Sequence, residues 1–359
     1  MSLKKLEILP VGNFLHGRTN HLCDVPGVLV GTSNSSKFSK NKSGVTAILA
    51  SKNIFQKSFA AGSFIQNGAG ECSGLHQLNE WGMLESPILL TNTHGVGTAY
   101  SACVKWLMKK YSAIGRTWPV TIPVVGECDD SLLNDIKKFS LSETQVMSAL
   151  KNAKKQIIVG DCGGGTALSS CGVKAGSGTS SRILDIDSKR FHVAVWMQSN
   201  WGIPDDLKIF GRTLDQWGLH VPNLPRVSEG SLISVVATDA PLDSETLTRL
   251  AKRAALGIAR CGNTARHSSG EFFIAFSTGR SWKRSSRKNS DWVAEPLKPL
   301  TLSESLINQF FACTADVSEE AYYQSLFSCL PTWTRNGQAV PALRWNFTQS
   351  QLDLIFPKK

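Results

Sequence analysis

A glycine followed by a serine, at residues 230 and 231, stands between a loop-like and a strand-like segment of the chain. Residues 221–228 include two prolines and an asparagine, typical of an exposed loop, and residues 231–238 form a run with several β-branched side chains. A cut between Gly230 and Ser231 would leave Ser231 with both a hydroxyl and a free α-amine. The hydroxyl could attack a carbonyl carbon while the amine, with a pKa of roughly 7.7–8.0 in model peptides, takes the proton.

Cleavage at this bond would make the chain a precursor of two pieces, residues 1–230 and 231–359. The same pair also suits an ordinary turn, because Gly–Ser pairs before strands are common. Residues elsewhere that could assist Ser231 therefore matter for the choice between the two interpretations.

A second serine, Ser269, lies two residues before a carboxylate, Glu271, at the start of the apolar run 272–276. In an extended chain, residues two apart project to the same face, so these side chains would be neighbours. A hydroxyl beside a carboxylate could orient the Ser231 amine and relay protons. A surface turn with an exposed glutamate is the alternative.

Asn200 follows the apolar run 191–198, which predicts a buried strand. An asparagine at a strand end can donate its side-chain amide to a developing oxyanion. The alternative is a turn-forming asparagine before Gly202.

Apolar extended runs are interspersed with helical segments along the whole chain. Strands are expected within 24–31 after a turn, and over 44–50, 60–71, 88–93, 122–127, 191–198, 231–238 and 272–276. Helices are expected over 100–111, from a capping Ser142 onward, over 244–260 with Ser244 as the cap, and over 319–330. This pattern predicts a layered α/β or α+β fold.

Glycines cluster at 163–165 and recur at Gly176 and Gly178. A phosphate-binding P-loop would end in Gly-Lys-Ser/Thr, and the lysine is missing here. These glycines are therefore expected to serve tight turns and close backbone packing.

The length and composition are those of a globular protein. A chain of 359 residues suggests one large or two moderate domains, and 42% hydrophobic with 19% charged residues can form a large core. The nine cysteines show no C-x-x-C spacing, so neither a disulfide framework nor a metal site is expected. No signal-peptide core and no run of about 18 apolar residues is found, which favours a cytoplasmic protein without a membrane span.

The formal net charge is +11, and part of it lies in the basic segment 280–288. A basic cluster with a tryptophan could follow the phosphates of a nucleic acid. No other nucleic-acid signature accompanies it, so a solvated loop tip after a strand is expected and nucleic-acid binding is not.

Ten short segments together resemble the DmpA-type L-aminopeptidase/D-esterase family, peptidase family S58, whose relatives are the β-aminopeptidases. The first five are Asp-Val-Pro-Gly-Val-Leu-Val-Gly at 24–31, Asn-Gly-Ala-Gly-Glu at 67–71, Leu-Thr-Asn-Thr at 90–93, Val-Val-Gly-Glu at 124–127 and Leu-Asn-Asp at 133–135. The others are Gly-Ser-Gly-Thr-Ser-Ser-Arg at 176–182, Glu-Gly-Ser at 229–231, Ala-Thr-Asp-Ala-Pro-Leu at 237–242, Ser-Gly-Glu at 269–271 and Glu-Glu-Ala at 319–321. They occur in the family's order and cover most of the chain.

The resemblance implies an α+β fold, a four-layer αββα sandwich of the type shared with ornithine acetyltransferases. It implies cleavage between Gly230 and Ser231 and assembly of both pieces, residues 1–359, into one domain. The expected oligomer is a homotetramer, and no cofactor is implied. The expected activity is that of an N-terminal-nucleophile aminopeptidase acting on a small peptide or an amino-acid amide or ester.

The same resemblance assigns roles to particular residues. Ser231 would be the nucleophile, Ser269 and Glu271 would lie beside it, Asn200 would line the oxyanion hole, and Glu127 would lie near the free amine of the substrate. A carboxylate suits that place because it favours an ammonium group.

One departure concerns the residues after Glu127, where peptidases of this group carry an aromatic side chain that could donate to the oxyanion. Residues 128–134 contain no aromatic residue, and Asp129 and Asp130 add negative charge that favours cationic substrates. Losing one oxyanion donor can cost roughly 2.7–4 kcal/mol in the transition state. Two other functions stay open: acyl transfer, as in ornithine acetyltransferases, which use a threonine nucleophile, and a non-catalytic binding role.

Overall fold

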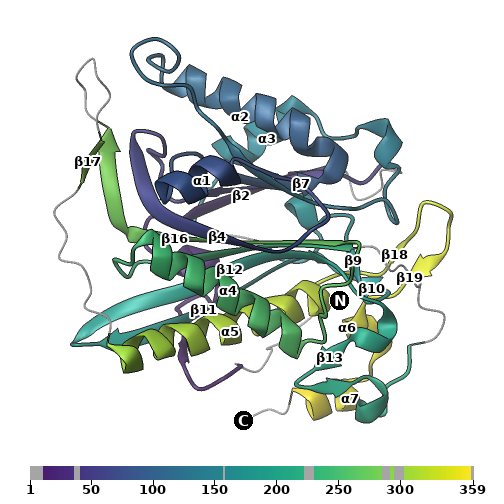
Figure 1. Cartoon of the computed structure of the whole chain (residues 1–359). Coiled ribbons are helices and arrows are strands. Elements are labelled where there is room, and N and C mark those ends of the chain that lie inside the picture. Colours follow the sequence, from purple (N-terminus) through teal and green to yellow (C-terminus); the bar gives the residue numbers. More distant parts are fainter. Residues whose placement is uncertain are drawn as a thin grey trace.

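The computed structural model describes residues 11–35, 41–156, 158–221, 230–284, 292–294 and 303–356. Two β-sheets lie face to face, and each carries helices on its outer face, which gives four layers (Figure 1). This is the αββα sandwich that the sequence predicted, so the fold prediction is confirmed.

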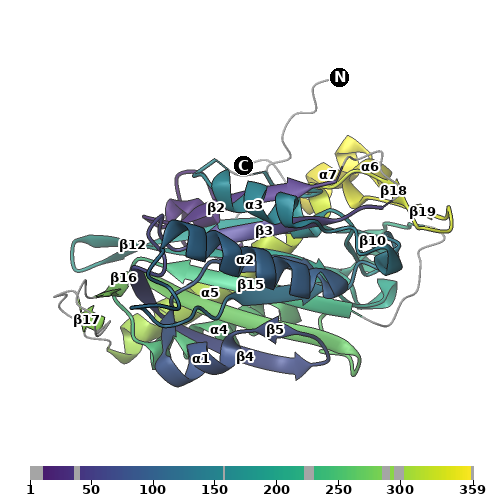
Figure 2. The same cartoon turned by 90° about the horizontal axis from the view of Figure 1, so that it is seen from above.

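The smaller sheet has the strand order β2–β3–β7–β8–β5 within the described part of the chain. Its strands are β2 (Leu29–Asn34), β3 (Gly44–Leu49), β7 (Ile88–Asn92), β8 (Val124–Cys128) and β5 (Cys72–Ser73). The pair β7–β8 is parallel. Helices α2 (Val96–Lys110) and α3 (Glu143–Lys151) cover its outer face, as the view from above shows (Figure 2).

The larger sheet has the order β1–β11–β12–β15–β16–β4–β6, with β17 paired to β16, among the residues described. Its strands are β1 (Leu15–His16), β11 (Ser177–Ile186), β12 (Lys189–Asn200), β15 (Gly230–Thr238), β16 (Ser269–Arg284), β4 (Lys57–Gly68), β6 (Met83–Leu84) and β17 (Trp292–Ala294). The pair β15–β16 is parallel, and it places residues 231 and 270 side by side.

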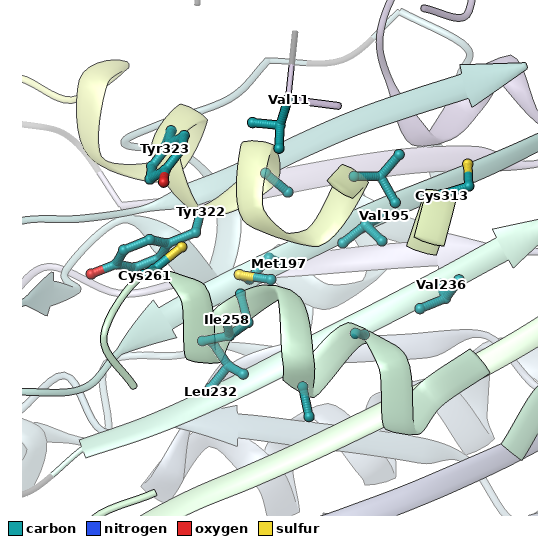
Figure 3. Packing of buried hydrophobic residues seen from close by; sticks show 14 of the residues in the cluster. Val11, Val195, Met197, Leu232, Val236, Ile258, Cys261, Cys313, Tyr322 and Tyr323 are labelled. Carbon is teal, nitrogen blue, oxygen red and sulfur yellow. The ribbon is translucent and has the colours of Figure 1, made fainter. Parts of the chain in front are cut away.

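Helices α4 (Ser244–Arg260) and α5 (Glu304–Phe327) cover the outer face of the larger sheet. Figure 3 shows Met197 of β12 and Leu232 of β15 near Ile258 of α4, with Val195 further along β12 in the same apolar cluster. A separate apolar cluster fills the space between the two sheets. Alternate residues of each central strand therefore enter different cores, which explains their continuous apolar runs.

Shorter elements connect the layers. The helices are η1 (Leu22–Asp24), α1 (Leu75–Trp81), η2 (Thr93–Gly95), η3 (Ile136–Lys138), η4 (Gly163–Gly165), η5 (Pro204–Asp206), η6 (Asp215–Trp217), α6 (Leu343–Asn346) and α7 (Gln349–Ile355). The two-residue strands pair as β9 (Ser169–Ser170) with β10 (Val173–Lys174), β13 (Lys208–Ile209) with β14 (Arg212–Thr213), and β18 (Thr332–Trp333) with β19 (Ala339–Val340). Among the described residues, no helix has the length and apolarity needed to span a membrane.

Two helix predictions need correction. Ser244 does not cap α4: the cap is Asp243, whose carboxylate accepts a hydrogen bond from Thr246 N at 2.8 Å. The last long helix begins at Glu304 rather than near 319, and its cap is Ser303, whose Oγ accepts a hydrogen bond from Leu306 N at 3.3 Å. The stretch at 313–318 is entirely buried, polar residues included, so it lacks the apolar–polar contrast of an amphipathic helix.

The glycine-rich segment around residues 176–178 leads into β11, a strand that the sequence pattern did not predict. Gly178 lets α5 pack directly on this strand, because a Cβ there would lie 2.7 Å from Ser325 N. The main chains of β11 and α5 approach so closely at Gly178 that no side chain fits there, which is the close backbone packing expected for these glycines.

The prediction that residues 280–288 form a solvated loop tip is wrong for residues 280–284. Residues 280–284 continue β16, and Arg284 is buried with its guanidinium 2.8 Å from the Glu85 carboxylate. Part of the positive charge is therefore neutralised inside the protein, and residues 285–288 lie outside the described residues.

Candidate active site

Gly230 and Ser231 are the first two residues of β15, between β12 and β16 in the larger sheet. The expected loop before them, at 222–229, lies outside the described residues. Gly230 packs against the end of β12 so closely that a Cβ would lie 2.7 Å from Trp201 Cα. The main chain before Ser231 is therefore held against its neighbouring strand.

The Ser231 side chain points toward the other sheet. The register pairs Ser231 with Gly270 and Ile233 with Phe272, and Ile233 and Phe272 belong to the core between the sheets. Ser231 is only 2% exposed, and its Oγ accepts a hydrogen bond from the Asp129 main-chain N–H at 2.9 Å. A residue directly after β8 of the smaller sheet thus orients the hydroxyl.

Asn200 is the register partner of Ser231 on β12, so both side chains lie on the same face. Its Nδ2 donates a hydrogen bond to the main-chain carbonyl of Asp129. Donation to an oxyanion would replace this bond. Asp129 therefore links the two side chains, contacting Ser231 through its N–H and Asn200 through its carbonyl.

Ser269 and Glu271 lie on the opposite face of the sheet from the Ser231 hydroxyl. Their register partners are Gly230 and Leu232, and Leu232 belongs to the core beneath the helices. Ser269 Oγ donates to Glu271 Oε1 at 3.0 Å, and Asn263 Nδ2 donates to the same oxygen at 2.9 Å. This pair is placed to approach the main chain around the 230–231 bond, and not the Ser231 hydroxyl.

Glu271 is fully buried, and burial raises the pKa of its carboxyl group. The hydrogen bonds from Asn263 and Ser269 lower this pKa and partly offset the effect of burial. Within the described residues its second oxygen, Oε2, has no hydrogen-bond partner. An unpaired buried carboxylate oxygen is costly, and a cationic partner would relieve that cost.

Glu127 reaches the site from β8 in the smaller sheet. It is 3% exposed, and its carboxylate accepts hydrogen bonds from Thr93 Oγ1 and from Glu71 N, the latter at 3.3 Å. Burial is the main cause that raises the pKa of this carboxyl group, and the charges of Asp129 and Glu71 act in the same direction. A buried anion with anionic neighbours attracts an ammonium group.

A cavity of about 400 Å³ brings Ser231 and Glu127 together, whereas Asn200, Ser269 and Glu271 are not among the residues that line it. Its lining includes Ser231, Gly230, Glu127, Asp129, Thr93 and His94. Among the described residues, no three His, Cys, Asp or Glu side chains are grouped so that they could hold a metal ion. The cavity has room for a small organic molecule with its amine near Glu127 and a carbonyl group near Ser231.

The five site side chains were predicted from the sequence, but the contact of the Asp129 main chain with Ser231 was not. The loop that carries it is held by Asp130, a buried carboxyl group that accepts hydrogen bonds from Asn92 Nδ2 at 3.1 Å and from Asn134 Nδ2. The Leu-Asn-Asp segment at 133–135 was the available signal, because it contains Asn134. No pattern in the sequence could show that the main chain at Asp129 meets Ser231.

The chain is similar to known peptidases over most of its length. The model of peptidase family S58 matches residues 20–340. The β-peptidyl aminopeptidase BapA of Sphingosinicella microcystinivorans is 32% identical over 352 residues, which cover 91% of this chain and 86% of that protein. BapA of Sphingosinicella xenopeptidilytica is 36% identical over 286 residues, 73% of this chain and 70% of that protein.

Solved structures of similar proteins share the whole fold. A β-aminopeptidase of Burkholderia sp. has a TM-score of 0.85 and 32% identity, covering 99% of this chain and 98% of its own. The L-aminopeptidase D-Ala-esterase/amidase of Ochrobactrum anthropi, described as a prototype of the serine aminopeptidases with a variant of the Ntn hydrolase fold, has a TM-score of 0.84 and 31% identity, covering 96% of each chain. The chain therefore belongs to peptidase family S58, and it is an aminopeptidase, a hydrolase, of that family.

Proposed function

We propose that this protein is a self-cleaving serine aminopeptidase that releases the N-terminal amino acid of a small peptide, amide or ester through an acyl-enzyme on Ser231. One observation carries the proposal: the Ser231 hydroxyl lines a cavity opposite the Glu127 carboxylate, while Ser269 and Glu271 lie on the other face of the strand. The hydroxyl and the main-chain nitrogen of one residue therefore face different chemical surroundings.

Maturation would begin with attack of Ser231 Oγ on the Gly230 carbonyl carbon, which moves the acyl group from nitrogen to oxygen. Water then hydrolyses this ester, leaving a carboxylate on Gly230 and a free α-amine on Ser231. The neutral amine can donate a hydrogen bond to Glu271 Oε2, which lacks a partner in the uncleaved chain, and the carboxylate would stabilise the ammonium that forms when the amine takes a proton. Cleavage and completion of the site are thus one event.

In turnover, Ser231 Oγ attacks the carbonyl carbon of the substrate's first residue, and the α-amine takes the hydroxyl proton. The amine then gives this proton to the leaving nitrogen, and the first product departs as a free amine. Water, deprotonated by the same α-amine, hydrolyses the ester and releases the amino acid. Glu127 binds the substrate ammonium and so selects an N-terminal residue.

Two hydrogen-bond donors near Ser231 would stabilise the oxyanion. The Asn200 amide leaves the Asp129 carbonyl to meet the oxyanion, and the Asp129 N–H, already 2.9 Å from Ser231 Oγ, lies close to where that oxygen develops. A main-chain donor here would substitute for the aromatic donor that residues 128–134 lack. The named relatives act on β-peptides and on L-amino-acid or D-alanine derivatives, so both α- and β-amino acids are proposed as N-terminal residues.

The test is the intact mass of the purified protein together with hydrolysis of amino-acid p-nitroanilides. The wild-type chain should yield fragments 1–230 and 231–359, and Ser231→Ala should stay a single inactive chain. Ser234→Ala is the matched control: Ser234 is buried on the same strand, and its hydroxyl has no hydrogen-bond partner among the described residues. Normal processing of Ser231→Ala, or a second fragment that begins elsewhere, would refute the assignment.

A further inference from the structure

A second, larger cavity of about 910 Å³ opens beside the active site, between the η3 turn and the β18–β19 hairpin that Figure 1 draws in yellow. Its lining includes Lys42, Lys137, Lys138, Arg335, Trp333 and Asp135. Four of these side chains are basic and one is acidic. The lining therefore favours an anion.

The basic groups of this cavity have few partners to neutralise them. Within the described residues, the side chains of Lys137, Lys138 and Arg335 make no hydrogen bond or ion pair, and all three are exposed. Lys42 Nζ donates to Thr332 Oγ1 and to the Trp333 carbonyl, which are both uncharged. An anion in this cavity would thus meet available charge-assisted donors.

The electrostatic surroundings of Lys42 point the same way. Its pKa is lowered by burial and by the charge of Lys174, and Asp161 only partly offsets this. Asp161 itself is paired with Lys174, at 2.7 Å. A bound carboxylate would stabilise the positive charge on Lys42 that these surroundings oppose.

The two cavities lie on opposite sides of one short turn. Ile136 lines the cavity of Ser231, while Asp135, Lys137 and Lys138 line the second cavity. In a 3₁₀ turn the rise is about 2 Å per residue, so these side chains start within a few ångströms of each other. The leaving group of a peptide would extend past this turn to reach the second cavity, and each extended residue adds about 3.3 Å of reach.

We propose that the second cavity is a subsite for the carboxylate of the leaving group. It would bind the C-terminal carboxylate, or an acidic side chain, of a peptide whose ammonium end lies at Glu127. This inference rests on the proposed function and deepens it. The preferred substrates would be short peptides with opposite charges at their two ends, rather than amides or esters.

The experiment compares peptide acids with their C-terminal amides, at lengths of two to four residues and with the same first residue. A third substrate with an aspartate before a C-terminal amide separates an acidic side chain from a C-terminal carboxylate. The wild-type enzyme should favour at least one acid over its amide by about three- to tenfold in kcat/KM, mainly through KM, because exposed ion pairs are individually weak. This preference should decrease as the ionic strength rises.

The triple variant Lys137→Gln, Lys138→Gln, Arg335→Gln should lose the preference and still hydrolyse the amide at the wild-type rate. A control with the same change in net charge removes three exposed lysines elsewhere, with Lys109→Gln, Lys151→Gln and Lys189→Gln, and should keep the preference for the acid. The proposal is overturned if the triple variant keeps the wild-type ratio at every length, or if the wild-type enzyme shows no preference.

Failure of the proposed function would look different, because neither the acid nor the amide would be hydrolysed. Calorimetric binding of the same acid and amide pair to the Ser231→Ala chain then decides the subsite separately. Tighter binding of the acid that the triple variant abolishes supports the subsite, and equal binding of acid and amide rejects it.

Discussion

Replacing Asp130 by asparagine should make the protein more stable at neutral and alkaline pH. Asp130 is 4% exposed, and its hydrogen-bond donors, Asn92 and Asn134, are neutral amides. Burial raises the pKa of this carboxyl group from 3.8 to about 7. Asparagine has nearly the same shape and carries no charge, so it removes the cost of ionisation. With its Oδ1 in the place of Asp130 Oδ2, it can still accept hydrogen bonds from Asn92 and Asn134, and only the bond accepted by Asp130 Oδ1 is lost.

The direction of this stability change follows from the raised pKa of Asp130 in the folded protein. The unfolded chain releases the Asp130 proton near pH 4, and the folded chain releases it only near pH 7. The contribution of this group to stability is therefore complete below about pH 4 and is lost as the pH rises through 7. A pKa difference of about three units corresponds to about 4 kcal/mol, which is the upper limit of the effect.

The assay is urea unfolding of Asp130→Asn and its parent at several pH values between 4 and 8. Both proteins carry Ser231→Ala, so that all samples are expected to be single chains. Near pH 4 the two free energies of unfolding should differ by about 1 kcal/mol or less, because only neutral hydrogen bonds are exchanged. At pH 8 the variant should be the more stable by up to about 4 kcal/mol.

The control is Asp187→Asn, an exposed carboxyl group with a positive φ of 47° in the turn between β11 and β12, a conformation that asparagine also tolerates. Because Asp187 is exposed, this control gives the effect of exchanging an aspartate for an asparagine without burial. If the difference in free energy of unfolding between Asp130→Asn and its parent does not change with pH, or favours the parent as the pH rises, burial does not hold Asp130 neutral.

Three further substitutions test the site itself. Glu127→Gln should lower kcat/KM for substrates with a free amine by roughly 30-fold or more, as expected for a lost buried charge pair. Intact mass should show that self-cleavage is unchanged. An equal loss of kcat/KM for N-acetylated substrates would contradict the idea that Glu127 binds the amine. Asn200→Ala should lower kcat by about 10²- to 10³-fold, and an unchanged kcat would exclude it as an oxyanion donor. Gly230→Ala forces a Cβ to 2.7 Å from Trp201 Cα, so it should destabilise the strand pairing by about 1–3 kcal/mol and reduce processing, seen as uncleaved chain on a denaturing gel; full processing at the wild-type melting temperature would show that the strands can separate freely.

The sequence by itself was enough to predict the elements whose apolar pattern is local. The strands near 44–50, 88–93 and 231–238 and the helix at 244–260 were found close to their observed bounds. Each has either a continuous apolar run or a clear period of 3.6, so neighbouring residues carry the signal. The αββα fold followed from the resemblance carried by ten dispersed segments, and not from any one of them.

Elements whose character depends on distant contacts were missed. β11 begins with small and polar residues, and Gly178 among them lets α5 pack directly on the strand. Residues 313–318 of α5 are all buried, including the polar Thr314, Asp316 and Ser318, so they show no apolar–polar pattern. Residues 280–284 look like a solvated basic loop, yet Arg284 pairs with Glu85 inside the protein. Burial in these cases is imposed by segments far away in the chain, which no local pattern records.

In the candidate site, too, the residue types could be predicted from the sequence, whereas their arrangement could not. The sequence named Ser231, Ser269, Glu271, Asn200 and Glu127, and their catalytic roles remain predictions. Only the tertiary structure decided that the Ser231 hydroxyl lies on one face of β15 and the Ser269–Glu271 pair on the other, because strand register fixes which side chains share a face. It also brought the main chain at Asp129 from the second sheet to the hydroxyl, since contacts between stacked sheets depend on how the whole chain folds and not on the spacing of residues along it.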